Sequence, residues 1–380
     1  MFEARFCLPG RSCVAMFRRI VSLKADTSPM QDKPHSPVDK LHLEDLEIGR
    51  TIPFGHKLVT KDEIVAFARA YDPQLIHLDE EVARKSIVGG LCASGFHSCA
   101  MFMRMLADDV LNHSTSLGSP GMDEVKWMKP VRPGDVLSGR YTCTEKRALG
   151  SRPEVGLSKV HFEMLNQKDE TVMSWDSNQL LKVRHPLAAS TGATRANGNA
   201  KPAPLSSFWE MSGPPPSRTS NHFEDRVIGE MADLGSHTFA EDEIIAFARE
   251  YDPQPFHIDA EAAKSSLFGA LCASGWHTAA HYIRLSVALR QKIEAEIAAA
   301  GGRNAIYGPS PGFKNVRWLK PVYVDDTIAF RTRTSEKIEL KSRPDRGLMR
   351  FETQGRNQNG EIVFAITGQI LVERREPYRA

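Results

Sequence analysis

Two short stretches of the chain each place an aspartate and a histidine five residues apart. Asp72 and His77 lie in YDPQLIHLD at 71–79, and Asp252 and His257 lie in YDPQPFHID at 251–259. A carboxylate and a neutral imidazole can exchange protons near pH 7, which suits a reversible acid–base reaction. The proline after each Asp interrupts a helix, so the His can fold back toward the Asp. The two pairs are therefore candidate acid–base sites.

A string of small residues follows each pair. GGLCASG begins at Gly89 and GALCASG begins at Gly269, and each leads into an apolar stretch that we expect to be a long buried helix. A helix that starts at these glycines would offer free N–H groups to a developing oxyanion, so Gly89 and Gly269 are the candidate donors. The hydroxyls of Ser94 and Ser274, about one turn further in, could orient a substrate or water. Close helix–sheet packing and hydroxyls bonded to their own helix are the alternatives.

Other readings of the acidic and histidine residues are simpler. Each Asp could cap the following helix while its His is merely packed. Asp72, His77 and Asp79 lie close together, but a metal site needs further ligands, and we expect no metal there. His97 and His277 fall inside the expected buried helices, and we interpret them as core histidines.

The chain is an internal repeat. DEIVAFARAYDPQLIHLD from Asp62 and DEIIAFAREYDPQPFHID from Asp242 agree at 13 of 18 positions, at an offset of 242 − 62 = 180. VKWMKPVRPGD from Val125 matches VRWLKPVYVDD from Val316 at an offset of 316 − 125 = 191. Copy two therefore holds 191 − 180 = 11 extra residues, which we place in the helical pattern at 289–308.

The repeat and the composition predict the domain boundaries. With 380 residues the chain is long enough for two domains. We place copy one at 40–185 and copy two at 222–376. A stretch rich in Pro, Gly, Ser and Ala at 186–221 predicts a linker, and residues 1–39 are expected to be a disordered leader.

The order of expected elements is the same in both copies. In copy one, KDEIVAFARAY and DEEVARKSI have helical patterns, and the apolar stretch from Gly89 follows them. Three or more alternating stretches rich in β-branched and aromatic residues come next and predict antiparallel strands. The fold class is α+β, with a sheet wrapped around a long helix in each copy.

Together, FARAYDPQLIHLD, GGLCASG and WMKPVRPGD resemble the MaoC-like, or R-specific enoyl-CoA hydratase, family of hotdog-fold proteins. The resemblance covers both copies, so it implies a double hotdog in which one chain forms a pseudo-dimer. It implies syn addition of water to a trans-2-enoyl-CoA, or the reverse dehydration, with no cofactor. The family's catalytic Asp and His correspond to Asp72 and His77, and to the pair in copy two. Gln74 and Gln254 stand where the family often has Asn.

Composition and charge give no argument for a nucleic-acid or membrane partner. The net charge is +2 and 41% of the residues are hydrophobic, so we expect neither nucleic acid nor a membrane as partner. Six cysteines without CxxC spacing indicate a reducing compartment, and we expect a cytoplasmic protein.

Some functional alternatives remain open at this stage. Both copies keep the Asp, His, Gly and Ser, so we expect two active sites. The acyl-CoA substrate could instead be branched or dicarboxylic, such as mesaconyl-CoA. A hotdog thioesterase and a non-catalytic acyl-CoA binding protein are the competing functions, and a homo-oligomer is compatible with the pseudo-dimer.

Overall fold

The two copies have the same order of elements in the computed structural model, which describes residues 40–185 and 207–377. The predicted leader and residues 186–206 of the predicted linker lie outside the described residues. The elements of copy one are η2 Leu43–Asp45, β1 Thr51–Leu58, α1 Lys61–Tyr71, α2 Leu75–Leu78, α3 Glu80–Lys85, α4 Gly95–Leu106, the π-helical η3 Ala107–Leu111, β2 Ser116–Trp127, β3 Val136–Leu149, β4 Arg152–Leu165 and β5 Thr171–Lys182.

Copy two repeats this order, with one longer helix in place of α4 and η3. Its elements are η4 Phe223–Asp225, β6 Met231–Thr238, α5 Glu241–Tyr251, α6 Pro255–Ile258, α7 Ala260–Lys264, α8 Gly275–Ala299, β7 Gly312–Trp318, β8 Thr327–Glu339, β9 Arg346–Arg356 and β10 Ile362–Glu373. The helix α8 has 25 residues, whereas α4 has 12. The extra residues of copy two thus lengthen this helix and the loop after it, as the sequence predicted.

The strands form one sheet across both copies. Its order is β1-β3-β4-β5-β2-β7-β10-β9-β8-β6, and every pairing between neighbours is antiparallel. The copies join where β2 pairs with β7, with Val125 opposite Phe313. Gly121 and Gly312 allow this close approach, because a Cβ at either residue would lie about 2 Å from a carbonyl oxygen of the facing strand. The structure therefore has the double hotdog architecture.

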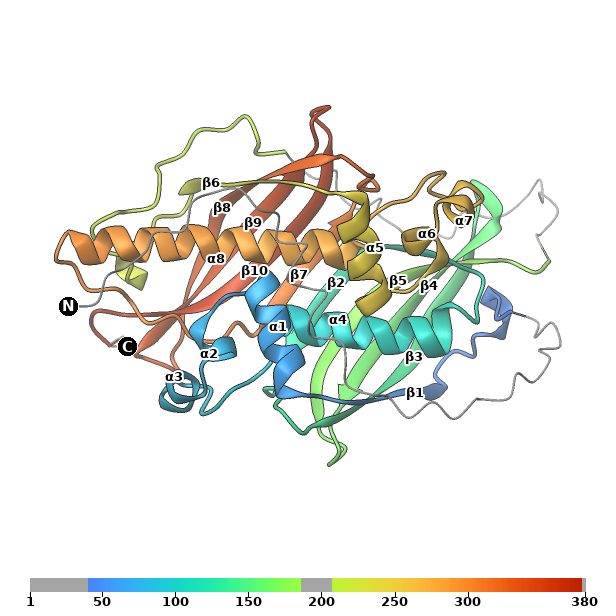
Figure 1. The fold of residues 1–380 in the computed structure, drawn as a ribbon, viewed down its shortest axis with the longest axis horizontal. Helices are drawn as coiled ribbons and strands as arrows, with labels where there is room; N and C mark the ends of the chain where they lie inside the picture. Colours follow the sequence, from blue (N-terminus) through green and yellow to red (C-terminus); the bar gives the residue numbers. More distant parts are fainter. Residues whose placement is uncertain (1–39, 186–206, 378–380) are drawn as a thin grey trace, which may run out of the picture. The chain divides into compact units, whose positions relative to one another are not determined.

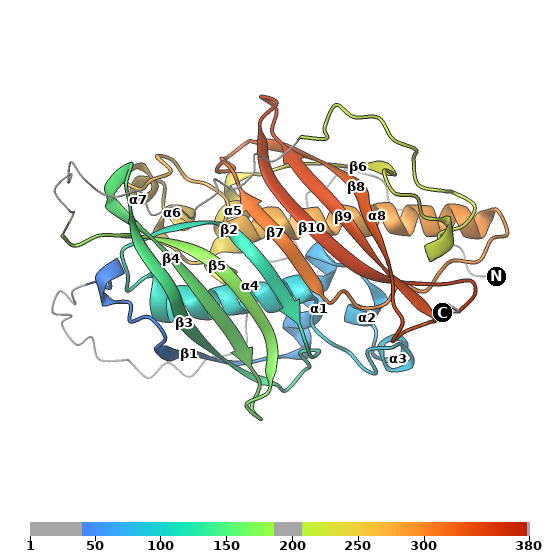
Figure 2. The same cartoon turned by 180° about the vertical axis from the view of Figure 1, so that it is seen from behind.

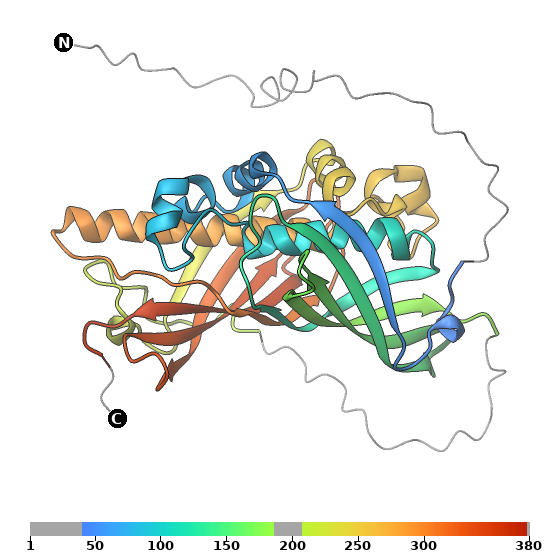
Figure 3. The same ribbon diagram turned by 90° about the horizontal axis from the view of Figure 1, so that it is seen from below.

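The helices lie on one face of this sheet. Figures 1 and 2 show α4 and α8 running along the sheet, each over the strands of its own copy. Figure 3 shows the shorter helices α1–α3 and α5–α7 as a further layer, on the side of α4 and α8 away from the sheet. The core lies between the long helices and the sheet, where residues such as Phe102, Trp175, Phe313 and Phe364 are almost fully buried.

Local sequence explains where the two loops that carry the Asp–His pairs begin. Thr60 caps α1 through a capping box with Glu63, and apolar residues at helical spacing bury one face of the helix. The helix ends at Tyr71, because Pro73 disfavours a helical conformation at Asp72. The same construction ends α5 at Tyr251. Each Asp is thus held rigidly at the end of a packed helix.

Part of the predicted linker packs against copy two. Residues 207–221 are described, and Phe208 among them is 2% exposed beneath the guanidinium of Arg333. The backbone N–H of Met231 donates to the carbonyl of Pro214. Composition assigned this segment to a linker, but its buried aromatic residue ties its last part to the sheet.

Candidate active site

The carboxylate of Asp72 is buried and receives two hydrogen bonds. Gln74 Nε2 donates to Oδ1 at 2.7 Å, and Ser94 Oγ donates to Oδ2 at 2.6 Å. His77 Nε2 lies 3.7 Å from Oδ2, which is too long for a direct hydrogen bond. The carboxylate is therefore held in place while one of its oxygens faces an imidazole nitrogen across a gap. A water molecule or a substrate hydroxyl can contact both groups there.

The backbone selects the tautomer of His77. Its Nδ1 lies 2.8 Å from the carbonyl oxygen of Cys92, which can only accept a hydrogen bond. In the neutral ring the proton must therefore sit on Nδ1, and the lone pair of Nε2 faces Asp72. Burial raises the pKa of the nearby Cys92 thiol to about 11, so this cysteine stays a neutral packing group. His77 is thus preset to accept a proton at Nε2.

Copy two reproduces this polar arrangement closely. His257 Nε2 lies 3.6 Å from Asp252 Oδ2, Ser274 Oγ donates to the same oxygen at 2.6 Å, and Gln254 donates to Oδ1 at 2.9 Å. His257 Nδ1 contacts the carbonyl of Cys272 at 2.7 Å. In neither copy does the Asp cap the next helix; Asp79 and Asp259 have that task. The structure thus brings the predicted Asp, His and Ser together in each copy, and their catalytic roles stay predictions.

The expected helix start at Gly89 is wrong. The helix α4 begins at Gly95 with Ser94 as its N-cap, so Ser94 precedes the helix rather than lying a turn inside it. Gly89 sits in the preceding turn with φ +68°, and its N–H donates to the carbonyl of Ser86. Gly269 likewise donates to Ser266, while α8 begins at Gly275. The two predicted oxyanion donors therefore have their N–H groups already engaged.

Gly95 is a donor that the sequence reasoning missed. It is the first residue of α4 and lines the same cavity as Asp72 and His77. Among the described residues its N–H has no acceptor, as is usual for the first turn of a helix. A Cβ at this position would come within 2.4 Å of the Trp127 ring, so only glycine fits. The serine cap followed by a glycine in CASG was the available signal for this helix start.

A cavity of about 640 Å³ opens at the copy-one pair and continues into copy two. Copy one contributes the polar groups at one end, where Ile87 and Lys129 also line the cavity. Copy two contributes a mostly apolar continuation along α8 and strands β8–β10, with Tyr282, Val287, Ile293, Phe351, Ile366 and Ile370 among its walls. Neither Asp252 nor His257 lines this cavity. The size suits a small-molecule site, and its apolar part suits an extended apolar group.

The equivalent space over the copy-one sheet is filled by aromatic rings. Trp175 is 1% exposed and stacks on Trp276 with ring centroids 5.4 Å apart, while Phe102 and Phe162 pack against its edges. In the repeat, Ile366 is the copy-two match of Trp175 (366 − 175 = 191). Phe96 is the copy-one match of Trp276 (276 − 96 = 180). Smaller side chains at these matching positions leave the cavity open beside the copy-one pair.

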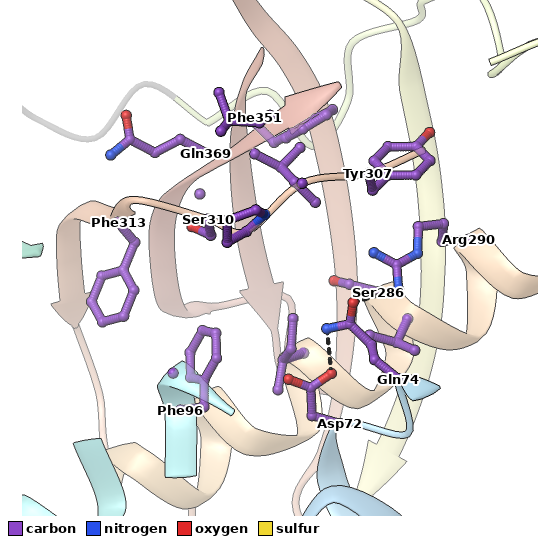
Figure 4. A pocket seen from close by; sticks show the side chains of 18 of the residues that line it. Asp72, Gln74, Phe96, Ser286, Arg290, Tyr307, Ser310, Phe313, Phe351 and Gln369 are labelled. Atoms are coloured by element: carbon purple, nitrogen blue, oxygen red, sulfur yellow. Dashed lines mark hydrogen bonds between the residues drawn. The ribbon is translucent and has the colours of Figure 1, made fainter. Parts of the chain in front are cut away.

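Copy two also reaches into the copy-one site through Arg290. Figure 4 shows Gln74 between Asp72 and Arg290, which extends from α8. Arg290 Nη2 donates to Gln74 Oε1 at 2.7 Å, and Gln74 in turn donates to Asp72. Arg290 lies on the part of α8 that extends beyond the length of α4, and no donor to the side-chain oxygen of Gln254 is found among the described residues. The two polar sites therefore differ in the support of their glutamine, and no pattern in the sequence signals it.

Comparisons with known proteins cover most of the chain. The model of the family described as MaoC like domain matches residues 45–163 and 224–350, one match in each copy. The uncharacterised protein YdeM of Bacillus subtilis is 29% identical over 142 residues, which are 37% of this chain and 99% of that protein. A protein of that size corresponds to a single copy of the repeat.

Solved structures match the whole double arrangement. A MaoC domain protein from Chloroflexus aurantiacus J-10-fl superposes with a TM-score of 0.70 at 18% identity, covering 90% of this chain and 100% of that one. A conserved hypothetical protein from Mycobacterium tuberculosis, described as having a double hotdog fold, gives a TM-score of 0.64 at 15% identity over 88% of this chain and 98% of its own. At these identities the match establishes the fold.

Among the described residues no helix has the length and apolar character needed to span a membrane.

Proposed function

Because the chain belongs to the MaoC-like domain family, we propose that it catalyses the reversible addition of water to a trans-2-enoyl-CoA, giving a 3-hydroxyacyl-CoA. The observation that carries this proposal is the buried pair Asp72 and His77 at the polar end of a cavity whose remainder is apolar. An acyl thioester has the same division between a polar reacting group and an apolar chain. No cofactor is required for this reaction.

The arrangement supplies each proton transfer that hydration needs. A water that contacts both Asp72 and His77 loses a proton to His77 Nε2 while its oxygen bonds to C3 of the enoyl group. The displaced electron pair moves onto the thioester oxygen, which the N–H of Gly95 at the helix N-terminus stabilises. The imidazolium then returns the proton to C2 and becomes neutral again. Asp72 orients the water and balances the transient charge on His77.

We infer that copy one performs the chemistry on longer acyl chains and that copy two provides most of the chain-binding space. The stacked Trp175 and Trp276 occupy the space that an acyl chain at Asp252 and His257 would need. The repeat alone predicts two active sites. For substrates with an extended chain, we expect only the copy-one pair to be active. An acyl-CoA with a simple aliphatic tail fits the lining better than a dicarboxylic one, because Arg290 is already engaged by Gln74.

The test follows the absorbance of the enoyl thioester with crotonyl-CoA and longer trans-2-enoyl-CoAs. Asp72→Asn/His77→Gln should lower kcat/KM on longer chains by at least about 100-fold, since acid–base groups contribute factors of this order. The matched variant Asp252→Asn/His257→Gln should lower it less than about threefold. Release of free thiol would reveal a thioesterase, and tight binding without turnover would reveal a binding protein; either result refutes the hydratase proposal.

A further inference from the structure

A second cluster of ligand-type side chains lies in copy two, away from Asp252 and His257. It joins three elements: His237 from β6, Glu243 from α5 and His281 from α8. The atoms that could bind a metal in these residues all lie within 4.8 Å of one another. His237 Nε2 is 2.6 Å from Glu243 Oε1, and His281 Nε2 is 4.0 Å from the same oxygen. Three separate elements therefore converge on one point.

A fourth histidine stands directly behind His281. His277 precedes it by four residues on α8, so both rings lie on one face of the helix. Their Nε2 atoms are 3.2 Å apart. Zn–N bonds of about 2.0–2.1 Å place two nitrogen ligands of a tetrahedral ion about 3.3 Å apart, which matches this separation. The HxxxH spacing of His277 and His281 is the one signal of this cluster visible in the sequence.

The polar atoms of the cluster are incompletely paired. His281 is 6% exposed and His277 is fully buried, and among the described residues the Nδ1 atoms of both rings lack a hydrogen-bond partner. Within hydrogen-bond distance, Nε2 of His281 meets only another imidazole nitrogen. Buried polar atoms without a partner are uncommon, and a bound ion would give the His281 imidazole a partner that the described residues do not supply.

The internal repeat shows that the fold does not require these residues. The matching positions in copy one hold Lys57, Glu63 and Met101, at an offset of 180. Lys57 and Glu63 form an ordinary ion pair at 2.7 Å, and Met101 is buried as a core side chain. Copy two keeps the carboxylate and replaces the cation and the thioether by imidazoles. This exchange turns a charge pair into a set of donors that suits a divalent transition-metal ion.

We propose that His237, Glu243 and His281 bind one divalent transition-metal ion with zinc-like preferences, with His277 as the nearest further donor. Solvent can reach the ion, because the side chains of His237 and Glu243 are 27% and 32% exposed. The rings of His237 and His281 are stacked with centroids 3.5 Å apart, so binding turns them toward the common ion. The ion would fasten β6 and α5 to α8. It would also lie beside Tyr71, whose ring packs edge-on against His281 next to Asp72.

The test uses tag-free full-length protein stripped of metal with a chelator. Zn²⁺ titration by calorimetry and the visible spectrum of added Co²⁺ should show one bound ion per chain, and Zn²⁺ should raise Tm. His237→Lys/His281→Met installs the copy-one residues at matching positions, and we expect Zn²⁺ affinity to fall by more than about tenfold. His161→Asn serves as control, because it removes another His–carboxylate pair, with Asp176, far from the cluster in the sheet.

The outcomes separate the proposal from general affinity for metal ions. Uptake of no Zn²⁺ by the wild type, or equal uptake by the double variant, overturns it. If the double variant does not fold, Glu243→Gln decides, because it preserves shape and removes only the charged ligand. Loss of the Co²⁺ spectrum in Glu243→Gln supports the site, and an unchanged spectrum refutes it. None of these measurements depends on hydratase activity.

Discussion

Ser94 combines two tasks in a single hydroxyl. Its oxygen accepts the N–H of Phe96 at the start of α4, and its proton goes to the carboxylate of Asp72. We predict that Ser94→Ala lowers kcat/KM by roughly 10- to 100-fold, since a hydrogen bond to a charged group is worth about 1.5–3 kcal/mol. Both serines are N-caps, so Ser274→Ala should cost similar stability, about 0.5–2 kcal/mol, with little loss of activity on long chains. Steady-state kinetics beside thermal unfolding separates the two effects, and equal kinetic losses would contradict the prediction.

His97 gives the stability of the fold a pH dependence. It is fully buried against Phe67, and burial, together with the charges of Lys57 and His77, lowers its pKa to about 3. The unfolded chain takes up this proton near pH 6.5, so the stabilising contribution is complete above that pH and is lost as the pH falls toward 3. We predict that the contribution of His97 to the free energy of unfolding falls by about 2 kcal/mol between pH 7.5 and pH 5.0.

Urea unfolding at the two pH values measures this loss, with His97→Leu as the comparison. The variant has no imidazole at this position, so its free energy of unfolding should fall by about 2 kcal/mol less than that of the wild type over the same interval. The same decline in both proteins would assign the pH dependence to other groups.

At the level of single residues, the sequence located what is local and missed what depends on the exact turn. Asp72 and His77 could be paired because Pro73 ends a helix between them. Gly89 and Gly95 both precede an apolar stretch, so this pattern alone does not separate them. The structure decides the choice, because the N–H of Gly89 donates to Ser86 in the preceding turn, whereas Ser94 caps the helix that begins at Gly95.

The helix α8 carries the element-level difference between the copies. Its lengthening was predictable from the shift in offset, but the reach of Arg290 to Gln74 depends on how α8 crosses copy one. We predict that Arg290→Met lowers kcat on longer chains by about tenfold, because Gln74 loses the charged partner that orients it toward Asp72. The value of kcat is the measurement, since Arg290 acts through Gln74 as a positioning residue.

Arg284 provides the matched control for this element. It also extends from α8 to copy one, where it donates to the backbone carbonyls of Arg69 and Ala70 rather than to the side chain of Gln74. Arg284→Met should therefore change stability more than turnover. Arg290→Lys keeps a charge but not the geometry of the guanidinium, and partial recovery of kcat is expected. A loss of kcat that is equal in Arg284→Met and Arg290→Met would refute the positioning role.

For the whole molecule, repetition predicts a symmetry that packing then breaks. The double arrangement, the shared fold of both copies and the retained Asp, His and Ser all follow from the repeat. The repeat does not predict that the space beside the copy-two Asp–His pair is filled while the space beside the copy-one pair is an open cavity. This difference depends on which rings meet between the sheet and the long helices. The sequence shows Trp175 and Ile366 at matching positions, yet it does not show that both point into the space an acyl chain would use.

This asymmetry leads to a prediction on chain length. Ile366→Trp installs in copy two the matching residue of Trp175, which fills the space over the copy-one sheet. The new ring should fill the cavity beyond Asp72 and His77. We expect kcat/KM to fall by more than about tenfold for long enoyl-CoAs and to change little for crotonyl-CoA, because only an extended chain meets the new ring. Thr367→Asp, which also installs the copy-one residue but on the next position of the strand, should leave the profile unchanged. Equal losses for short and long substrates would mean that the cavity over β10 does not hold the acyl chain.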